Sequence, residues 1–63
     1  MKAKIALATV SGKAYYLIVK ELKRKNLPFL SLTPGEPVPI EVEVVITTQD
    51  EMQLVNHKRL LVY

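Results

Sequence analysis

The sequence predicts a small α/β domain with a mostly parallel four-stranded sheet in the strand order 2-1-3-4. Three observations lead to this prediction. Strand-like and helix-like segments follow one another in the order β-α-β-β-α-β, which favours parallel strands joined by crossovers. The first strand-like segment, residues 4–10 (KIALATV), is nearly continuous in apolar residues, as expected of a strand buried on both faces. Right-handed crossovers then place this strand inside the sheet, beside the second and third strands.

Length and composition limit what the chain can be. With 63 residues it forms one domain at most, and a chain of this size buries only about 60% of the surface that its unfolded form exposes. The absence of Cys excludes disulfides and thiolate metal sites, and together with few Asn and Gln it favours a heat-adapted source. No apolar run approaches the roughly 20 residues of a membrane-spanning helix, so we expect a cytoplasmic protein without a membrane partner.

Residues 12–25 have the spacing of an amphipathic helix. Ser11 offers a hydroxyl that can cap its first turn, and Asn26 can adopt the left-handed conformation that ends a helix before Pro28. Basic residues crowd the last turn, where the helix dipole favours cations. The apolar stripe recurs at intervals of three and four residues and consists of Tyr15, Ile18, Val19 and Leu22.

The remaining segments are shorter. Residues 29–32 predict the second strand, and residues 33–39, with three of the four prolines, predict an extended loop that crosses the sheet. Residues 42–47 predict the third strand. The pattern Thr48-x-x-Glu51 matches a capping box and predicts a short helix to about Val55, followed by a turn and a fourth strand over 59–63.

This arrangement leaves one face of the sheet thinly covered. The long helix covers one face, whereas the other receives only the proline loop and the short helix, and parallel sheets are rarely left wet on one face. We therefore expect a partner surface there, either a second copy of the chain or a following domain. The chain also stops on an apolar run, residues 60–63, which favours an N-terminal module of a longer protein.

The carboxyl ends of strands 1 and 3 form the predicted ligand crevice, because neighbouring crossovers leave there on opposite faces. Backbone N–H groups at the helix start, with a lysine nearby, could bind an anion such as a phosphate. The alternative is a capped helix start that binds nothing. The segment is not a Walker A loop, since Leu7 stands where that motif needs Gly and Ala14 follows the lysine. The candidate anion-binding residues are Ser11, Gly12, Lys13, Thr47 and Thr48.

Other candidates are less specific. Tyr16 and Leu17 could form an apolar interface pair on the helix flank, or pack at the edge of the core. The basic residues of segment 20–25 could contact nucleic-acid phosphates, but a solvated helix face is the favoured explanation and no nucleic-acid-binding motif is present. His57 is the only histidine and has too few potential ligands nearby for a metal site. We predict no catalytic residue, no cofactor and no metal.

The order of these segments resembles half of a Rossmann-like or receiver-like α/β domain. More narrowly, four stretches are similar to the N-terminal region of a family of uncharacterised archaeal proteins: residues 4–9 (KIALAT), 20–24 (KELKR), 28–35 (PFLSLTPG) and 44–48 (VVITT). The resemblance implies that a ribonuclease-H-like, resolvase-like domain follows this region. It covers almost the whole chain, but its motifs are structural, so it implies no catalytic residue here.

Two functions follow from the sequence. The first is a non-catalytic interaction, oligomerisation or accessory module, dimeric in isolation, that works with a larger protein such as one acting on nucleic acid. The second is a small domain that binds an anion or a nucleotide phosphate at the turn between the first strand and the helix. An enzyme is the least favoured class, because no acid, base and nucleophile converge.

Overall fold

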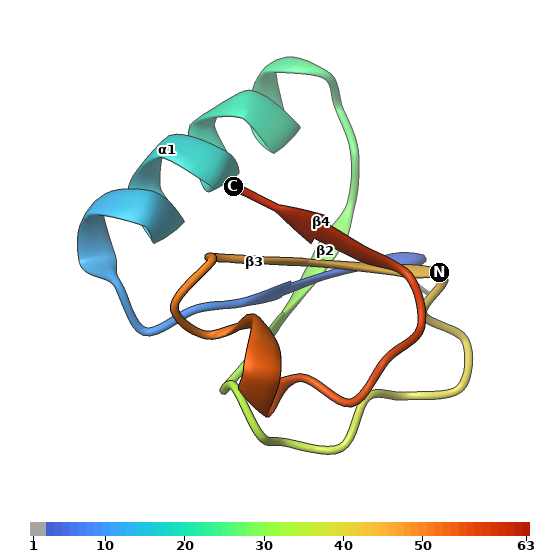
Figure 1. The fold of residues 1–63 in the computed structure, drawn as a ribbon. Helices are drawn as coiled ribbons and strands as arrows, with labels where there is room; N and C mark the ends of the chain where they lie inside the picture. The colour runs from blue at the N-terminus through green and yellow to red at the C-terminus, as the bar shows by residue number, and fades with distance from the viewer. Residues whose placement is uncertain (1–2) are drawn as a thin grey trace.

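A computed structural model, which describes residues 3–63, confirms the predicted architecture (Figure 1). Four parallel strands form one sheet in the order β2-β1-β3-β4. The elements follow one another as β1 (Ile5–Ala8), α1 (Gly12–Arg24), β2 (Phe29–Leu32), β3 (Val44–Thr47), the 3₁₀ turn η1 (Met52–Leu54) and β4 (Leu60–Val62). The chain is therefore a half-sized, Rossmann-like α/β domain with a single long helix.

The central strand β1 is buried because it is paired on both sides. Ile5 lies opposite Phe29 on β2 and Val44 on β3. The side chains of β1 alternate between the two faces of the sheet. Leu7 lies on the helix face, and Ala6 and Ala8 lie on the opposite face. Small alanine side chains on that opposite face allow a loop, instead of a second long helix, to approach the sheet closely.

The helix α1 begins and ends as the sequence predicts. The Ser11 hydroxyl accepts a hydrogen bond from the Ala14 N–H at 3.4 Å, and Asn26 has a positive φ of 58°. The Leu27 N–H donates to the Leu22 carbonyl at 2.9 Å, which is the six-residue closure of a Schellman motif. Local capping thus fixes both ends of α1 and directs the chain into β2.

The buried stripe of α1 differs from the predicted one, and Val19 is only partly buried. Ala14, Ile18 and Leu22 are buried, whereas Tyr15 is 37% exposed. The Tyr15 hydroxyl reaches beyond the helix and hydrogen-bonds to the Ser31 hydroxyl of β2 at 2.8 Å. A phenol hydroxyl loses less hydration at the edge of the core than inside it. Ala14, one position earlier, is therefore buried in the core in place of Tyr15.

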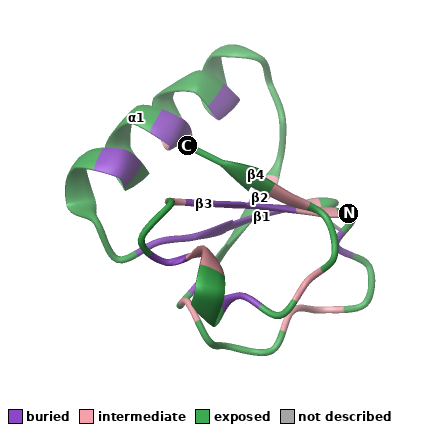
Figure 2. Ribbon diagram, in the orientation of Figure 1, coloured by how far each residue is buried: buried purple, intermediate pink, exposed green. Residues whose placement is uncertain are grey.

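The face opposite α1 is closed by the chain itself. Val42 and Val55 are buried there against Ala6, Ala8 and Val45, and Val38 of the proline loop packs on the same cluster. Figure 2 shows the buried centre of the sheet lying between α1 and this loop layer. This face is therefore better covered than expected, because apolar side chains turn inward onto it, and binding of a partner there stays a prediction.

The proline loop begins with a tight turn. The Glu36 N–H donates to the Thr33 carbonyl at 2.9 Å, and the Thr33 N–H donates to a carboxylate oxygen of Glu36 at 2.9 Å. Gly35 has a φ of 95°, a conformation that favours glycine. With Pro34 at the second position, this is the residue pattern of a type II turn.

The predicted short helix is absent; a 3₁₀ turn of three residues, Met52–Leu54, stands in its place. The physical reason is that Glu51 does not fold back on Thr48 alone but also bonds to the β1–α1 connection. Isolated helical turns are costly to nucleate, so this tertiary contact prevails. The third and fourth strands are also shorter than predicted, at Val44–Thr47 and Leu60–Val62.

Candidate functional site

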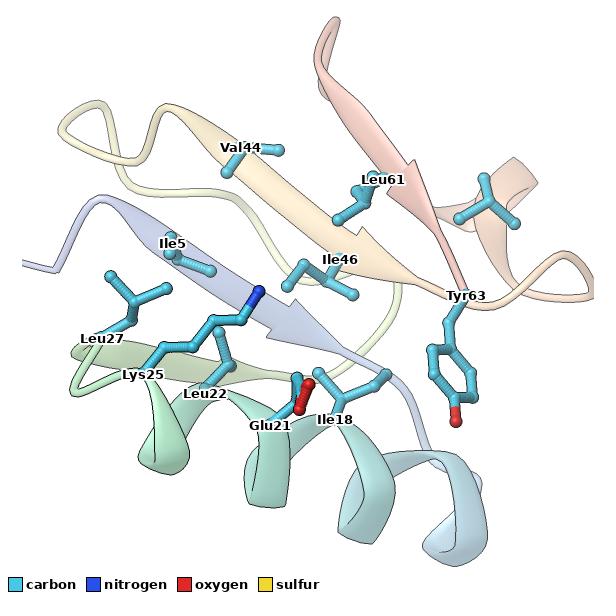
Figure 3. A pocket seen from close by; sticks show the side chains of 11 residues that line it. Ile5, Ile18, Glu21, Leu22, Lys25, Leu27, Val44, Ile46, Leu61 and Tyr63 are labelled. Atoms are coloured by element: carbon cyan, nitrogen blue, oxygen red, sulfur yellow. The ribbon is translucent and has the colours of Figure 1, made fainter.

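An apolar groove lies on the helix face of the sheet, beside α1 and over β3 and β4 (Figure 3). It has a volume of about 400 Å³ and is called the helix-side groove below. The strands contribute Ile5, Val44, Ile46, Leu61 and Val62, and the chain end contributes Tyr63. The helix contributes Ile18, Glu21 and Leu22, its C-cap contributes Lys25, and the segment leading to β2 contributes Leu27.

The groove exists because one helix is too narrow to cover four strands. The core cluster beneath α1 takes residues from β1, β2 and β3 but none from β4 in the described part of the chain. Leu61 is 57% exposed and Tyr63 is 60% exposed, although both lie next to the core. Figure 3 shows Tyr63 extending from the end of β4 toward the helix. Exposed apolar surface of this kind, concave and contiguous, is typical of binding sites.

The helix wall of the groove is cationic. Lys25 lines the groove, and Lys20 and Arg24 line a second depression of about 380 Å³ that shares Glu21 and Tyr63 with it. The Glu21 carboxylate accepts hydrogen bonds from Arg24 Nε at 3.0 Å and Nη2 at 2.6 Å. These bonds, with smaller contributions from the charges of Lys25 and Lys20, lower the pKa of Glu21, so one carboxylate stands among three cations on this wall.

A buried carboxylate occupies the carboxyl edge of the sheet, where strands β1 and β3 diverge. Glu51 accepts hydrogen bonds from the Thr9 hydroxyl at 2.5 Å, the Thr48 hydroxyl at 2.7 Å and the Val10 N–H at 2.8 Å. Thr9 in turn accepts from the Ser11 N–H at 3.1 Å. The chain therefore fills the predicted crevice with its own anion, which joins the β1–α1 connection to the β3–η1 turn.

The hydrogen bonds determine the ionisation of Glu51. Burial raises the pKa of its carboxyl, but bonds from Thr9, Thr48 and the Val10 N–H lower it further than burial raises it. The net pKa lies below the ordinary value, so Glu51 is ionised at neutral pH. Sequence analysis assigned this residue to a local capping box, and only the long-range contact with Thr9 reveals its structural role.

The comparison with protein-family models gives one match, to the response regulator receiver-like domain over residues 4–61. The chain belongs to this family. The comparisons with curated proteins and with solved structures give no significant match. The match confirms the receiver-like part of the resemblance seen in the sequence. Within the described residues of this receiver-like domain, no helix is both long enough and apolar enough to span a membrane.

The candidate anion-binding residues of this receiver-like domain lie at the same edge but do not form one pocket. Gly12 and Lys13 are exposed at the start of α1, and Ser11 is engaged in capping. Thr48 donates its hydroxyl to Glu51. Thr47 is fully buried, and its hydroxyl has no hydrogen-bond partner. Strand alternation places it on the same face as Val45, opposite α1. Anion binding by this set stays a prediction.

The candidate interface pair of the receiver-like domain is divided by the structure. Leu17 lines the second depression, next to Tyr63, whereas Tyr16 is 65% exposed and lines neither hollow. His57 is held by backbone groups, its Nδ1 accepting from the Arg59 N–H at 3.1 Å and its Nε2 lying 3.3 Å from the Val42 carbonyl. Among residues 3–63, no cluster of three metal-ligating side chains is present.

Proposed function

We propose that this receiver-like domain is a non-catalytic interaction module that binds another polypeptide through the helix-side groove. The observation that carries the proposal is the open apolar surface over β3 and β4, where Leu61 and Tyr63 are more than half exposed beside a packed core. Covering such a surface releases the water on it and is favourable in proportion to the apolar area buried.

The strand β4 strengthens this proposal. Within residues 3–63 it pairs with β3 on one side only, so its other edge offers unpaired backbone groups next to the groove. An edge strand of three residues is too short to be a strong template for aggregation, but it can still orient a bound chain. The groove supplies apolar contact, and the edge supplies hydrogen bonds.

The test is a selection of peptides from a displayed random library on the immobilised protein, followed by affinity measurements with two variants. Leu61→Ser removes an apolar side chain from the groove. Leu54→Ser is the matched control, because Leu54 is 58% exposed and Leu61 is 57% exposed, but Leu54 lies in η1 and does not line the groove.

We expect the selected peptides to bind Leu61→Ser at least about tenfold more weakly and Leu54→Ser as tightly as the wild type, since a central apolar contact dominates an interface. Peptides that bind both variants like the wild type would refute the proposal. A selection that yields no peptide above background would refute it as well.

Self-association is one form that this function could take. Sedimentation velocity at several concentrations tests it directly: a dimer that dissociates on Leu61→Ser places a second copy in the groove.

A following domain is another form that this function could take. The sequence resemblance supports an accessory role beside a nuclease-like domain, and the basic side of α1 supports nucleic acid as a further partner of such a protein.

Anion binding at the start of α1 is the second proposal from the sequence. Gly12 and Lys13 are exposed there, and neither donates a hydrogen bond to Glu51 in the described part of the chain. A phosphate titration followed by NMR tests it, with shifts expected at Gly12, Lys13 and Thr48. Absence of any shift at millimolar phosphate would exclude this site.

A further inference from the structure

The helix-side groove lies where a second helix beside α1 would pack on the sheet. The helix α1 occupies one place in a layer over the sheet, and the adjacent place over β3 and β4 is bare. Helices pack side by side at about 8–10 Å. A second helix beside α1 would therefore rest on Ile46 and Leu61 and touch Tyr63 at the end of β4.

The charged side chains around the groove determine which flanking residues are favoured on a helix bound there. Lys25 lines the groove and Lys20 lines the depression beside it. Among residues 3–63 neither lysine forms a salt bridge, and Glu21, the one carboxylate that lines the two hollows, is bonded to Arg24, so three cations there face a single anion. A helix lying against this wall would bring its flanking side chains close to both lysines, so acidic flanks are favoured and basic flanks are disfavoured.

A second copy of this chain fits the place poorly. The helix α1, the only α-helix within residues 3–63, has no acidic residue in its first turn and two basic residues in its last. Its exposed side also carries Lys13 and Lys20, with Glu21 already bonded to Arg24. Two such helices side by side would place like charges together, which opposes pairing through α1.

We propose that the helix-side groove binds an amphipathic α-helix of another polypeptide, whose apolar stripe is flanked by Asp and Glu residues. This inference rests on the function proposed above, because it names the partner of the same groove. A stripe with apolar residues at intervals of three and four would contact the floor of the groove, and the acidic flank would face Lys20 and Lys25.

The experiment uses three synthetic peptides of about 15 residues, each stabilised as a helix by a covalent staple on its outer side because free peptides of this length are marginal helices. The first has a Leu stripe flanked by Glu. The second has Lys in place of each Glu. The third has the composition of the first, but its Leu residues are scattered around the helix.

Binding is measured by chemical-shift changes in the labelled protein at low salt. We expect the first peptide to shift the amides of Ile46, Leu61 and Tyr63, the second to bind about tenfold more weakly, and the third not to bind. The double variant Lys20→Gln/Lys25→Gln should remove the preference for the first peptide. The double variant Lys13→Gln/Lys58→Gln loses the same charge at residues that line neither hollow and should retain the preference.

Each other outcome overturns the inference in a distinguishable way. Equal binding of the Glu and Lys peptides would refute the charge argument. Failure of the Glu peptide, while library peptides still depend on Leu61, would refute the helical partner and leave the proposed function standing. Failure of both would refute both. Binding to vesicles of anionic lipid, with no binding of the Glu peptide, would assign the groove to a membrane surface.

Discussion

The replacement Glu51→Gln is the most informative single change, because it removes one negative charge from the buried edge of the sheet with almost no change in volume. The carboxylate accepts three hydrogen bonds, from Thr9, Thr48 and the Val10 N–H. An amide has one oxygen and presents an NH₂ group to the remaining donors. Because the two hydroxyls share Oε1 and the Val10 N–H bonds to Oε2, the NH₂ group faces either the Val10 N–H, which then loses its acceptor, or both hydroxyls, which must turn to accept.

The magnitude follows from these contacts. Hydrogen bonds to charged groups contribute about 1.5–3 kcal/mol each, and Gln retains part of them, so we expect a loss of about 2–4 kcal/mol in the free energy of unfolding. A domain of this size has a total of roughly 3–9 kcal/mol. Urea denaturation followed by circular dichroism measures the loss. The control is Asp50→Asn, the same change of charge at the exposed neighbouring residue, for which we expect less than about 0.5 kcal/mol.

The pH dependence gives an independent check. Because the folded pKa of Glu51 lies below its unfolded value, its stabilisation is fully present above the ordinary Glu value of about 4.3 and is lost as the pH falls through the folded pKa. The difference in stability between wild type and Glu51→Gln should therefore shrink as the solution is acidified below that value. Glu21, whose pKa is also lowered, titrates in both proteins and cancels in the difference. A Glu51→Gln protein as stable as the wild type, or a difference independent of pH, would refute the bridging role.

Three further changes test separate parts of the structure. Thr47→Val should be neutral or stabilise the protein by about 1 kcal/mol, because the buried hydroxyl has no hydrogen-bond partner among the described residues. Thr9→Val removes a bond to Glu51 and should destabilise the protein by about 1–2 kcal/mol. The reverse order of stability in urea denaturation would contradict this account. Gly35→Ala should lower the free energy of unfolding by about 1–2 kcal/mol, because Gly35 has a φ of 95°. Gly12→Ala should be neutral, because a Cβ there would meet nothing within 4 Å. Equal melting temperatures for the two variants would refute the turn assignment. Lys13→Ala should abolish phosphate-induced NMR shifts with little loss of stability, and unchanged shifts would place any anion elsewhere.

The topology was predictable because it depends on patterns that lie within short segments. The apolar run around Leu7 identified the central strand, and the capping residues Ser11 and Asn26 fixed the helix. The alternation of elements then left one parallel order, which the structure confirms. The short helix after Thr48 was not predictable in the same way. A capping box and a tertiary bridge use the same residue types, and the bridging partner Thr9 lies 42 positions away in the sequence.

The site was predictable only in part. Sequence analysis found that the sheet is incompletely covered, but it placed the open surface on the wrong face. Which face is open depends on the inward turn of Val38 in the proline loop and of Val42 after it, and on how far α1 extends toward β4. Neither feature has a periodic signal in the sequence. In the sequence, Leu61 is one of several apolar residues of the predicted fourth strand and is not distinguished from its neighbours. Only the alternation of β4, with Leu60 packed on the loop side, makes Leu61 a groove residue.

The central place of β1 also constrains how the molecule assembles during synthesis. β1 precedes both of its partners in the chain, since it pairs with β2 and with β3, which is complete only after Thr47. A nascent chain can close the β1–α1–β2 unit early, but the second edge of β1 stays open until β3 has left the ribosome. Pairings this distant slow folding, so we expect refolding slower than that of helical proteins of equal length and early hydrogen-exchange protection in residues 5–32.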